Sequence, residues 1–298
     1  MKHYQIHQNF FNEAKKLRSE FDFQFNDPRS TESKRFVWDY WYFENQYHLM
    51  RTPAFYYFTK KLYQNFHSHL VQWGRENLGC HDISPPWMSY YVDGCYQNLH
   101  SDVPHGPWAW VYSLTLDPKM FRGGETLILK PDVLNYWSTF QDQQDREYTS
   151  FVDLIPAKFN QLVVFDPRFP HGVTEVKGTR DPQKARLVLH GWFVEPRPYV
   201  VGGLKVNQVQ PILSEALHVF SEELKKINPC LGTVSVRIQV GNDGVVCKYS
   251  EVTNTLVSIS GQVSETVQIR KLMKKIFLNL HFQKNKNSSY ITIPILFK

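Results

Sequence analysis

The stretch from Ser89 to Glu195 is a succession of short β-rich segments, and this pattern restricts the fold more than any other feature of the chain. The segments are rich in aromatic and β-branched residues, and loops containing Pro, Gly and Asp separate them. Many short strands without helices between them are typical of a β-sandwich or barrel rather than a parallel sheet. We predict strands at Ser89–Val92, Trp108–Leu116, Glu125–Lys130, Phe151–Ile155, Gln161–Asp166, Gly172–Lys177 and Lys184–Glu195, with a surface excursion at Asn135–Glu147.

The residues before this stretch are predicted to be mainly helical. Apolar side chains recur at helical spacing over residues 10–17 and again over residues 58–70. Gly79 is expected to end the second helix, because glycine is the residue that most often closes a helix. An aromatic block at residues 35–43 lies between the two patterns. It is expected to pack against a sheet, and lining a substrate pocket is the alternative.

The end of the chain has a different pattern. A Pro-rich segment at 195–198, followed by Gly202-Gly203, indicates a domain boundary. Beyond it we predict a helix, a hairpin, a second helix and a last strand, at Pro211–Ile227, Thr233–Val240 with Val245–Val252, Glu265–Leu280 and Tyr290–Phe297. Pro294 favours an edge position for that last strand.

We therefore expect two domains. The first covers residues 1–198, with a helical N-terminal support over 1–84 and a β core over 85–198. The second is a small α+β domain over 204–298, which we expect to be a binding or dimerising module. Strand addition at the edge that contains Pro294 would provide a homodimer or a protein partner, and plain structural support is the alternative.

Composition narrows the class of protein. The net charge of +6 and the pI of 9.0 are not concentrated in any long Lys/Arg run, so nucleic acid is not the favoured partner. The four cysteines show no Cys-x-x-Cys spacing, which indicates free thiols in a reducing compartment. The N-terminus lacks the apolar core of a signal peptide and no segment approaches a membrane span. We therefore expect a cytoplasmic protein without a membrane partner.

His100 and Asp102 form a His-x-Asp motif. In an extended backbone, residues two apart point to the same side, so an imidazole and a carboxylate would lie together. A third ligand has to come from far along the chain, and His171, which lies in a turn between Pro and Gly, is the candidate. Two histidines and one carboxylate are the ligand set of non-haem Fe(II) oxygenases. The motif alone is weak evidence in a chain with 12 histidines.

Arg186 begins an apolar segment that is predicted to be a central strand. It would share one face with Val188, His190 and Trp192, and the opposite face is also apolar. A buried arginine costs several kcal/mol unless an anion meets it, and a carboxylate suits its planar fork. The partner is a protein carboxylate, solvent at a rim, or a bound dicarboxylate. The nearby metal motif favours the dicarboxylate.

Taken in order, these residues resemble the Fe(II)/2-oxoglutarate-dependent dioxygenases. The likeness consists of Tyr91-x-x-Gly94 before the His-x-Asp motif, a Gly-Gly turn at 123–124, the distal His171, and Arg186 six residues before Trp-Phe. It covers residues 85–195 and is greatest for the prolyl-hydroxylase-like branch. The resemblance implies a double-stranded β-helix, or jelly roll, as the core of a mainly β, α+β chain.

The resemblance also implies roles. His100, Asp102 and His171 would bind Fe(II), Arg186 would hold the distal carboxylate of 2-oxoglutarate, and Tyr91 would add a hydrogen bond to it. With O2, and ascorbate as a candidate reductant, such a site would hydroxylate an unactivated C–H bond and release succinate and CO2. The implied substrate is an amino-acid side chain, either free or in a peptide or protein.

Three positions depart from the family pattern. Val188 stands where many relatives have Ser or Thr. Ser113 stands where close hydroxylases have a second cosubstrate tyrosine, and neighbouring Tyr112 is the candidate to compensate. His105 is a rival candidate for a metal ligand. We expect it instead to contact one of the metal-binding residues or to face the substrate.

Other functions stay open. A non-catalytic jelly-roll binding module would keep only the shape, and a zinc hydrolase could use the same ligands. An oxidative demethylase of nucleic acid would need a second arginine six residues after Arg186, where this chain has Trp192. Arg180 lies six residues before Arg186, but it is in a loop and does not fit that role. The C-terminal part weakly resembles the C-terminal domain of TonB-like transducers, through its hairpin, helix and final strand.

Overall fold

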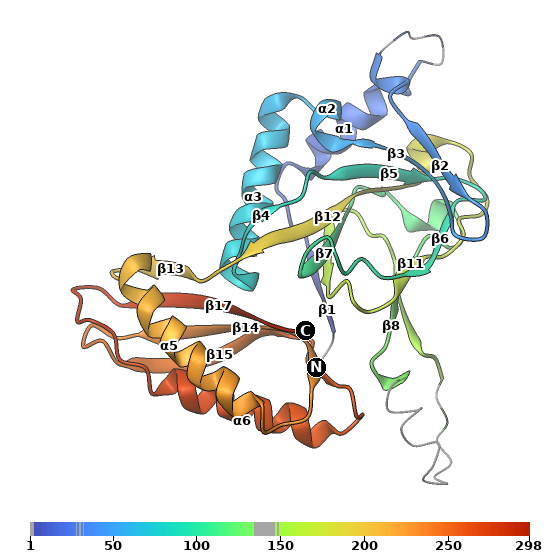
Figure 1. The fold of residues 1–298 in the computed structure, drawn as a ribbon. Coiled ribbons are helices and arrows are strands. Elements are labelled where there is room, and N and C mark those ends of the chain that lie inside the picture. The colour runs from blue at the N-terminus through green and yellow to red at the C-terminus, as the bar shows by residue number, and fades with distance from the viewer. Residues whose placement is uncertain (1–2, 28, 30, 32, 134–146, 148) are drawn as a thin grey trace.

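The computed structural model describes residues 3–27, 29, 31, 33–133, 147 and 149–298, and these form two separate β-sheets (Figure 1). One sheet has twelve strands and the other has five. Apart from Glu147, the excursion predicted at Asn135–Glu147 lies outside the described residues. None of the described helices is long and apolar enough to cross a lipid bilayer.

The twelve-stranded sheet contains most of the chain. Its strands are β1 (Tyr4–Gln8), β2 (Asp39–Phe43), β3 (Tyr47–Pro53), β4 (Cys80–Ile83), β5 (Trp87–Tyr91), β6 (Tyr96–His100), β7 (Trp108–Ser113), β8 (Thr126–Leu129), β9 (Val152–Ile155), β10 (Gln161–Phe165), β11 (His171–Val173) and β12 (Arg186–Pro196). The helices beside it are α1 (Ala14–Phe23), α2 (Ala54–Tyr57) and α3 (Lys60–Leu78). Gly79 caps α3 in the left-handed conformation, as predicted.

Strands β5 to β12 form a double-stranded β-helix. Four of them pair in the order β10-β7-β12-β5 and the other four in the order β6-β11-β8-β9, with every pair antiparallel. The chain alternates between the two halves from β5 to β8 and again from β9 to β12, as in a jelly roll. Strand β3 pairs with both β5 and β6 and so joins the halves along one side. The predicted core fold is confirmed.

All seven predicted strands are present, with ends that differ by a few residues. Strand β6, which was not predicted, ends at His100, the first residue of the His-x-Asp motif. Strand β12 lies between β5 and β7, so its predicted central position is also confirmed. Its outer face, with Leu187 and Leu189, packs on the core under α1 and α3. Its inner face carries Arg186 and Val188 into the barrel.

The N-terminal region is less helical than predicted. Strand β1 adds to the barrel beside β10, β4 pairs with the end of β12, and the aromatic block forms hairpin β2–β3. Aromatic side chains favour the pleated surface of a sheet over a helix or loop, which explains the hairpin. The side chain of Trp41 lines the barrel interior, whereas those of Tyr40 and Tyr42 are exposed. Only Trp38 of the block packs on the core and Trp41 lines the cavity, so the predicted core packing holds for one residue and most of the block is exposed.

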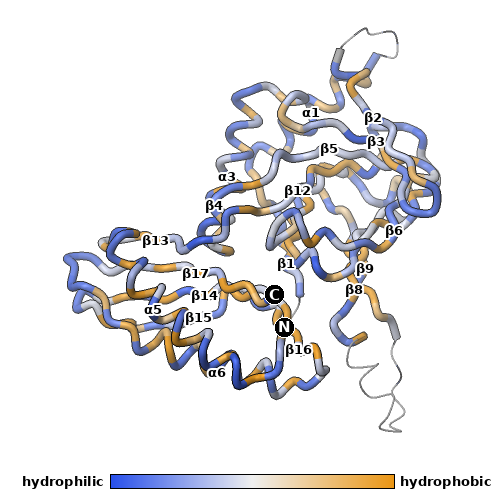
Figure 2. Tube along the Cα trace, viewed as in Figure 1, coloured by the Kyte–Doolittle hydropathy of each residue, from blue (hydrophilic) through white to orange (hydrophobic). Residues whose placement is uncertain are grey.

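The five-stranded sheet comprises β13 (Tyr199–Gly202), β14 (Cys230–Val240), β15 (Val246–Asn254), β16 (Val257–Ser258) and β17 (Ser289–Phe297). Helices α5 (Val206–Leu224) and α6 (Val263–Leu278) pack together along it (Figure 1). Along both helices hydrophobic and hydrophilic residues alternate, as expected when one face covers a sheet (Figure 2). This part has its own hydrophobic core. Whether it folds independently of residues 1–198 stays a prediction.

The edge position predicted for the last strand is wrong. Strand β17 lies between β13 and β14. Pairing with β13 ends at Thr292, so Pro294 lies beyond it and breaks no hydrogen bond of that ladder. Pairing with β14 runs along the whole length of β17, but beyond Thr292 the other side of β17 has no strand partner among the described residues, so strand addition beside Pro294 stays a prediction.

All four cysteines are free thiols, as predicted, and Cys247 is the exposed one.

Candidate metal centre

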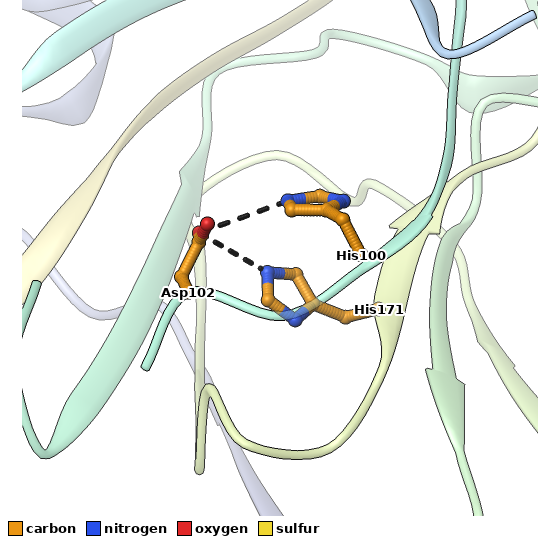
Figure 3. A group of neighbouring side chains, drawn as sticks. All are labelled: His100, Asp102 and His171. Atoms are coloured by element: carbon orange, nitrogen blue, oxygen red, sulfur yellow. Dashed lines mark ion pairs between the residues drawn. The ribbon is translucent and has the colours of Figure 1, made fainter. Parts of the chain in front are cut away.

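His100, Asp102 and His171 meet at the mouth of the barrel (Figure 3). His100 is the last residue of β6 and is the direct cross-strand partner of His171, the first residue of β11. One ligand atom from each of the three lies within 4.8 Å of the others. The Oδ2 atom of Asp102 is 3.4 Å from Nε2 of His171 and 3.7 Å from Nε2 of His100. The structure thus brings together the three residues that the sequence singled out.

Backbone carbonyls orient both imidazoles. The Nδ1 atom of His100 lies 3.0 Å from the carbonyl oxygen of Asn98, and that of His171 lies 3.0 Å from the carbonyl oxygen of Phe169. A carbonyl only accepts, so each Nδ1 is the protonated nitrogen and donates. The Nε2 lone pairs are then left to face Asp102, which is the tautomer that a metal ligand needs.

The charges in the cluster are coupled. In the metal-free cluster, burial acts to raise the pKa of the Asp102 carboxyl, but the two histidines outweigh it and hold that pKa well below its ordinary value, because a second proton on Nε2, which a metal ion would displace, can be donated to the carboxylate. Burial acts to lower the pKa of His100, and Asp102 more than reverses this, so the pKa is raised. Asp102 is therefore ionised at neutral pH. Two nitrogen donors and an anionic oxygen at this spacing suit a divalent cation with open positions.

A β-bulge shapes strand β6 next to the cluster. His171 pairs with His100, but Val173 pairs with Gln97, so one extra residue is accommodated on β6. The bulge lets Gln97, although three residues before His100, point to the same side. Gly172 is required opposite the bulge, because a Cβ there would lie 2.5 Å from the carbonyl oxygen of Gln97.

The cluster opens into a cavity of about 870 Å³ inside the barrel. All the predicted site residues line it: His100, Asp102, His171, Arg186 and Tyr91. Aromatic side chains, among them Trp41, Trp87 and Trp192, make up much of the remaining wall. The cavity is large enough for a small dicarboxylate together with part of a second molecule.

Arg186 is a buried cation without a counter-ion. Arg186 is 1% exposed, its Nη2 donates to the hydroxyl of Thr126 at 3.1 Å, and the side chain of Tyr91 also favours its charged form. Its Nε and Nη1 atoms have no partner in the described part of the chain. Its guanidinium carbon lies 4.7 Å from the centre of the Tyr91 ring. Burial lowers the pKa of Arg186, which marks the cost of keeping this charge inside the protein.

The sequence left three partners open for the Arg186 guanidinium: a protein carboxylate, solvent at a rim, or a bound dicarboxylate. A protein carboxylate is not its partner, because the described residues give it no ion pair. The side chain does not reach a solvent rim either, since it is buried. A bound anion remains, and the unpartnered N–H groups line the same cavity as the three candidate ligands.

Tyr91 is the cross-strand neighbour of Arg186. Its ring is 2% exposed and its hydroxyl donates to Oε1 of Gln97 at 3.4 Å, a long hydrogen bond. Burial is the main cause that raises the pKa of Tyr91, so the phenol is protonated and can donate.

The departures from the family pattern have different outcomes. Val188 lines the cavity, where it offers no hydroxyl. Tyr112 does not compensate for Ser113: alternate residues of β7 face opposite ways, and the Tyr112 hydroxyl donates to Asn160 in the outer core. His105 lies outside the cluster and packs on Trp192, with 4.4 Å between ring centres.

Three further cavity residues were not predicted. Thr126 provides the hydroxyl that Val188 lacks, from the opposite half of the barrel. Gln97 connects Tyr91 to His100, donating to Nε2 of the latter at 3.3 Å. Arg51, on β3, is a second cation in the cavity wall. No spacing rule selects them, because each depends on how distant strands pair.

The loop that precedes His171 is held by the five-stranded sheet. Asp166, which is fully buried, accepts hydrogen bonds from Arg168 and from the hydroxyl of Thr255. Arg168 also donates to the hydroxyl of Thr233 and to the carbonyl oxygen of Phe297, both at 2.6 Å. The same loop contacts the metal cluster directly, because the carbonyl oxygen of Pro167 accepts from the backbone N–H of Asp102 at 3.1 Å. The C-terminal part therefore supports two of the three candidate ligands.

Replacing Arg168 with glutamine is expected to lower both stability and metal affinity. The change leaves the buried Asp166 carboxylate without its ion pair, which should reduce the free energy of unfolding by up to about 3 kcal/mol. A loosened loop should weaken metal binding roughly 10-fold. Urea unfolding and metal titration of the folded protein measure the two effects. Arg197→Gln, which removes an exposed ion pair with Glu195, is the matched control and should change stability by less than about 1 kcal/mol. Equal effects of the two substitutions would contradict the role of Arg168.

No family model and no curated protein matches this chain. Residues 204–298 thus gain no support for a TonB-like resemblance.

Among solved structures, a Pseudomonas putida prolyl-4-hydroxylase matches with a TM-score of 0.41 and 16% identity, over 64% of this chain and 92% of that one. A Trichoplax adhaerens prolyl hydroxylase in complex with a hypoxia inducible factor peptide fragment matches with a TM-score of 0.41 and 14% identity, over 64% of this chain and 83% of that one. HygX from Streptomyces hygroscopicus, with nickel and 2-oxoglutarate bound, matches with a TM-score of 0.41 and 10% identity, over 63% of this chain and 81% of that one. Likeness at this level does not establish activity or cofactor, which have to be inferred from this chain's own residues.

Proposed function

We propose that this chain is an Fe(II)- and 2-oxoglutarate-dependent oxygenase. The observation that carries the proposal is the pairing, in one cavity, of a His-Asp-His cluster with the unpartnered guanidinium of Arg186. A metal site alone fits many functions, and so does a buried arginine. Together they fit a cosubstrate that chelates the metal at one end and carries a carboxylate at the other, as 2-oxoglutarate does.

The residues present fit both groups. The Nε2 atoms of His100 and His171 are free of protons and share one side with the Asp102 carboxylate, so the three would hold Fe(II) and leave positions open. Arg186 would bind the distal carboxylate through N–H groups without a protein partner, pairing that of Nε or of Nη1 with the second N–H of Nη2. When bound, the metal and the keto acid supply the oxidative chemistry with O2.

The protein's own groups would orient and protect the cosubstrate. The hydroxyl of Thr126 accepts a hydrogen bond from Nη2 and so holds the Arg186 guanidinium in place, while its other N–H groups could bind the cosubstrate. The protonated hydroxyl of Tyr91 would add a hydrogen bond to the same carboxylate if Gln97 releases it. Val188 and the aromatic wall exclude water around these contacts, which strengthens each charge interaction.

We further propose hydroxylation of an amino-acid side chain, in a free amino acid, a peptide or a protein, as the reaction. The support is the ordered set of site residues, which resembles the prolyl-hydroxylase-like branch. Two of the structures similar to this chain are described as prolyl hydroxylases, one with a peptide fragment bound.

Two other functions are less well supported. A non-catalytic binding module has no use for a costly unpaired cation beside a complete set of metal ligands. A zinc hydrolase would need a general base near the metal. Two other histidines line the cavity. His190 hydrogen-bonds to Ser89 at 2.8 Å and burial lowers its pKa to about 3, which makes it too weak a base for that role, and the His105 ring packs on Trp192 outside the cluster.

Turnover of 2-oxoglutarate tests the proposal. The purified protein is loaded with Fe(II) without oxygen, supplied with 2-oxoglutarate and ascorbate, and then exposed to O2, and succinate is measured. We expect succinate release that requires both Fe(II) and O2 and that increases when pools of amino acids or peptides are added. Glutarate, which has both carboxylates but no keto group, should inhibit without turnover. Absence of iron uptake and of succinate would favour the binding module instead.

A further inference from the structure

Arg51 is a second cation in the wall of the cavity. It lies on β3, the strand that joins the two halves of the barrel. Its guanidinium is sandwiched between the indole rings of Trp41 and Trp87, whose centres are 6.4 Å apart. The guanidinium carbon is 3.9 Å from the centre of the Trp87 ring. The two rings are inclined at 50° to each other, and both attract the cation and hold it in place.

No protein anion neutralises Arg51. The described residues offer it neither a salt bridge nor a hydrogen bond to its guanidinium, and its Nε atom is buried without a partner. Asp39 is its cross-strand neighbour but is exposed and makes no ion pair with it. Burial is the main cause that lowers the pKa of Arg51 to about 10, so it stays charged at neutral pH. A stacked, charged and unpaired guanidinium in a cavity wall is suited to bind an anion.

Charge balance indicates which kind of anion Arg51 would bind. With the proposed cosubstrate bound, the Fe(II) ion, Asp102 and Arg186 together carry two positive charges, which the two carboxylates of 2-oxoglutarate cancel. The charge of Arg51 then remains. One further carboxylate would balance it, whereas a phosphate dianion would leave an excess of negative charge in a largely aromatic cavity.

The wall around Arg51 indicates what the carboxylate is attached to. The cavity wall includes a group of largely apolar side chains on or next to β2, β3 and β5, together with the amides of Asn45, Gln46 and Gln97; the apolar group comprises Trp41, Tyr47, Pro53, Phe55, Pro86 and Trp87. These side chains offer large apolar faces and few hydrogen-bonding groups, so they suit an apolar body next to the anionic group.

We propose that Arg51 binds the carboxylate of the substrate, and that the substrate is therefore a small apolar molecule or chain terminus with a free carboxylate, such as an amino acid or the C-terminal residue of a peptide. This inference rests on the proposed function and narrows it. An internal segment of a protein has no terminal carboxylate and could pair with Arg51 only through an Asp or Glu side chain.

Binding of matched acids and amides tests the inference. The probes are N-acetyl amino acids with apolar side chains and their carboxamides, which differ only in the charge of the end group. They are titrated into the protein loaded with Fe(II) and 2-oxoglutarate without O2, and binding is followed by tryptophan fluorescence, to which Trp41 and Trp87 contribute. We expect at least one acid to bind roughly 10- to 100-fold more tightly than its amide, as a charge-assisted hydrogen bond implies.

Variants locate the preference. Arg51→Gln should bind acid and amide equally, and Arg51→Lys, which keeps the charge without the planar fork, should keep a smaller preference. Arg122→Gln is the matched control, because it replaces an exposed arginine that does not line the cavity and should leave the preference for the acid intact. Circular dichroism checks that each variant is folded.

The outcomes separate this inference from the proposed function. An acid preference that depends on Arg51, in a protein that also releases no succinate, would support the anion site and contradict the oxygenase. Succinate release without any acid preference, or with a preference that survives in Arg51→Gln, would overturn the anion site alone. The stack would then serve only to fasten hairpin β2–β3 to β5.

Discussion

Asp102→Ala is expected to abolish divalent-metal binding and, with it, 2-oxoglutarate turnover. The carboxylate is the one anion of the cluster and lies within 4 Å of both imidazoles, so without it the site has two neutral donors and no charge to hold the ion. The loss should exceed the roughly 10- to 100-fold that changes around a metal ligand cause. Calorimetric titration with Fe(II) in the absence of O2 measures it directly. His171→Ala should have the same effect.

His105→Ala is the matched control for this experiment. It removes another histidine of the same cavity, one that packs on Trp192 and lies outside the cluster. We expect it to retain metal binding and uncoupled succinate release. If His171→Ala kept full metal affinity and turnover, or if His105→Ala lost both, the assignment of the ligands would be wrong.

Arg186→Met is expected to have two opposite effects. Binding of 2-oxoglutarate should weaken roughly 100-fold or more, because two charge-assisted hydrogen bonds are lost and each contributes about 1.5–3 kcal/mol. The protein without ligand should become more stable, by about 1–4 kcal/mol, because a buried cation without a counter-ion is replaced by an apolar side chain. Cosubstrate titration of the metal-loaded protein and urea unfolding of the ligand-free protein measure these effects.

The combination distinguishes a functional arginine from a structural one. If Arg186 served to hold the barrel together, its replacement would lower stability and affect cosubstrate binding only indirectly. Arg122→Met, at an exposed position next to the Gly-Gly turn, is the control for replacing an arginine with methionine and should change neither quantity appreciably. A fall in stability of the ligand-free protein for Arg186→Met would contradict the view that its charge is kept for a ligand.

Local patterns were sufficient to predict the core fold. Alternating apolar residues and Pro, Gly or Asp loops placed seven strands of the barrel within a few residues of their observed ends. The Gly-Gly turn was predicted for the same reason, and both glycines do have positive φ angles, 75° at Gly123 and 74° at Gly124. These features depend on neighbouring residues, which is why they can be read from one sequence.

Pairing between distant strands could not be predicted in the same way. The edge position inferred for β17 was wrong because Pro294 excludes a hydrogen bond only on one side, and which strand lies on that side depends on where β13 ends. Tyr112 was misjudged because the face that a residue of β7 presents depends on its register with β10 and β12. In both cases the deciding contact joins residues far apart in the chain.

The sequence by itself determined which groups could do chemistry: a His-x-Asp pair, a distal histidine and an arginine in an apolar strand. Their spacing put His100 and Asp102 side by side, since an extended backbone alone does so. Only the tertiary structure decided that His171 joins them and that Arg186 has no protein counter-ion. It also decided that Arg51 enters the same cavity between two tryptophans. The physical reason is that a side chain's partner is set by strand register and closure of the barrel, and these depend on the whole chain at once.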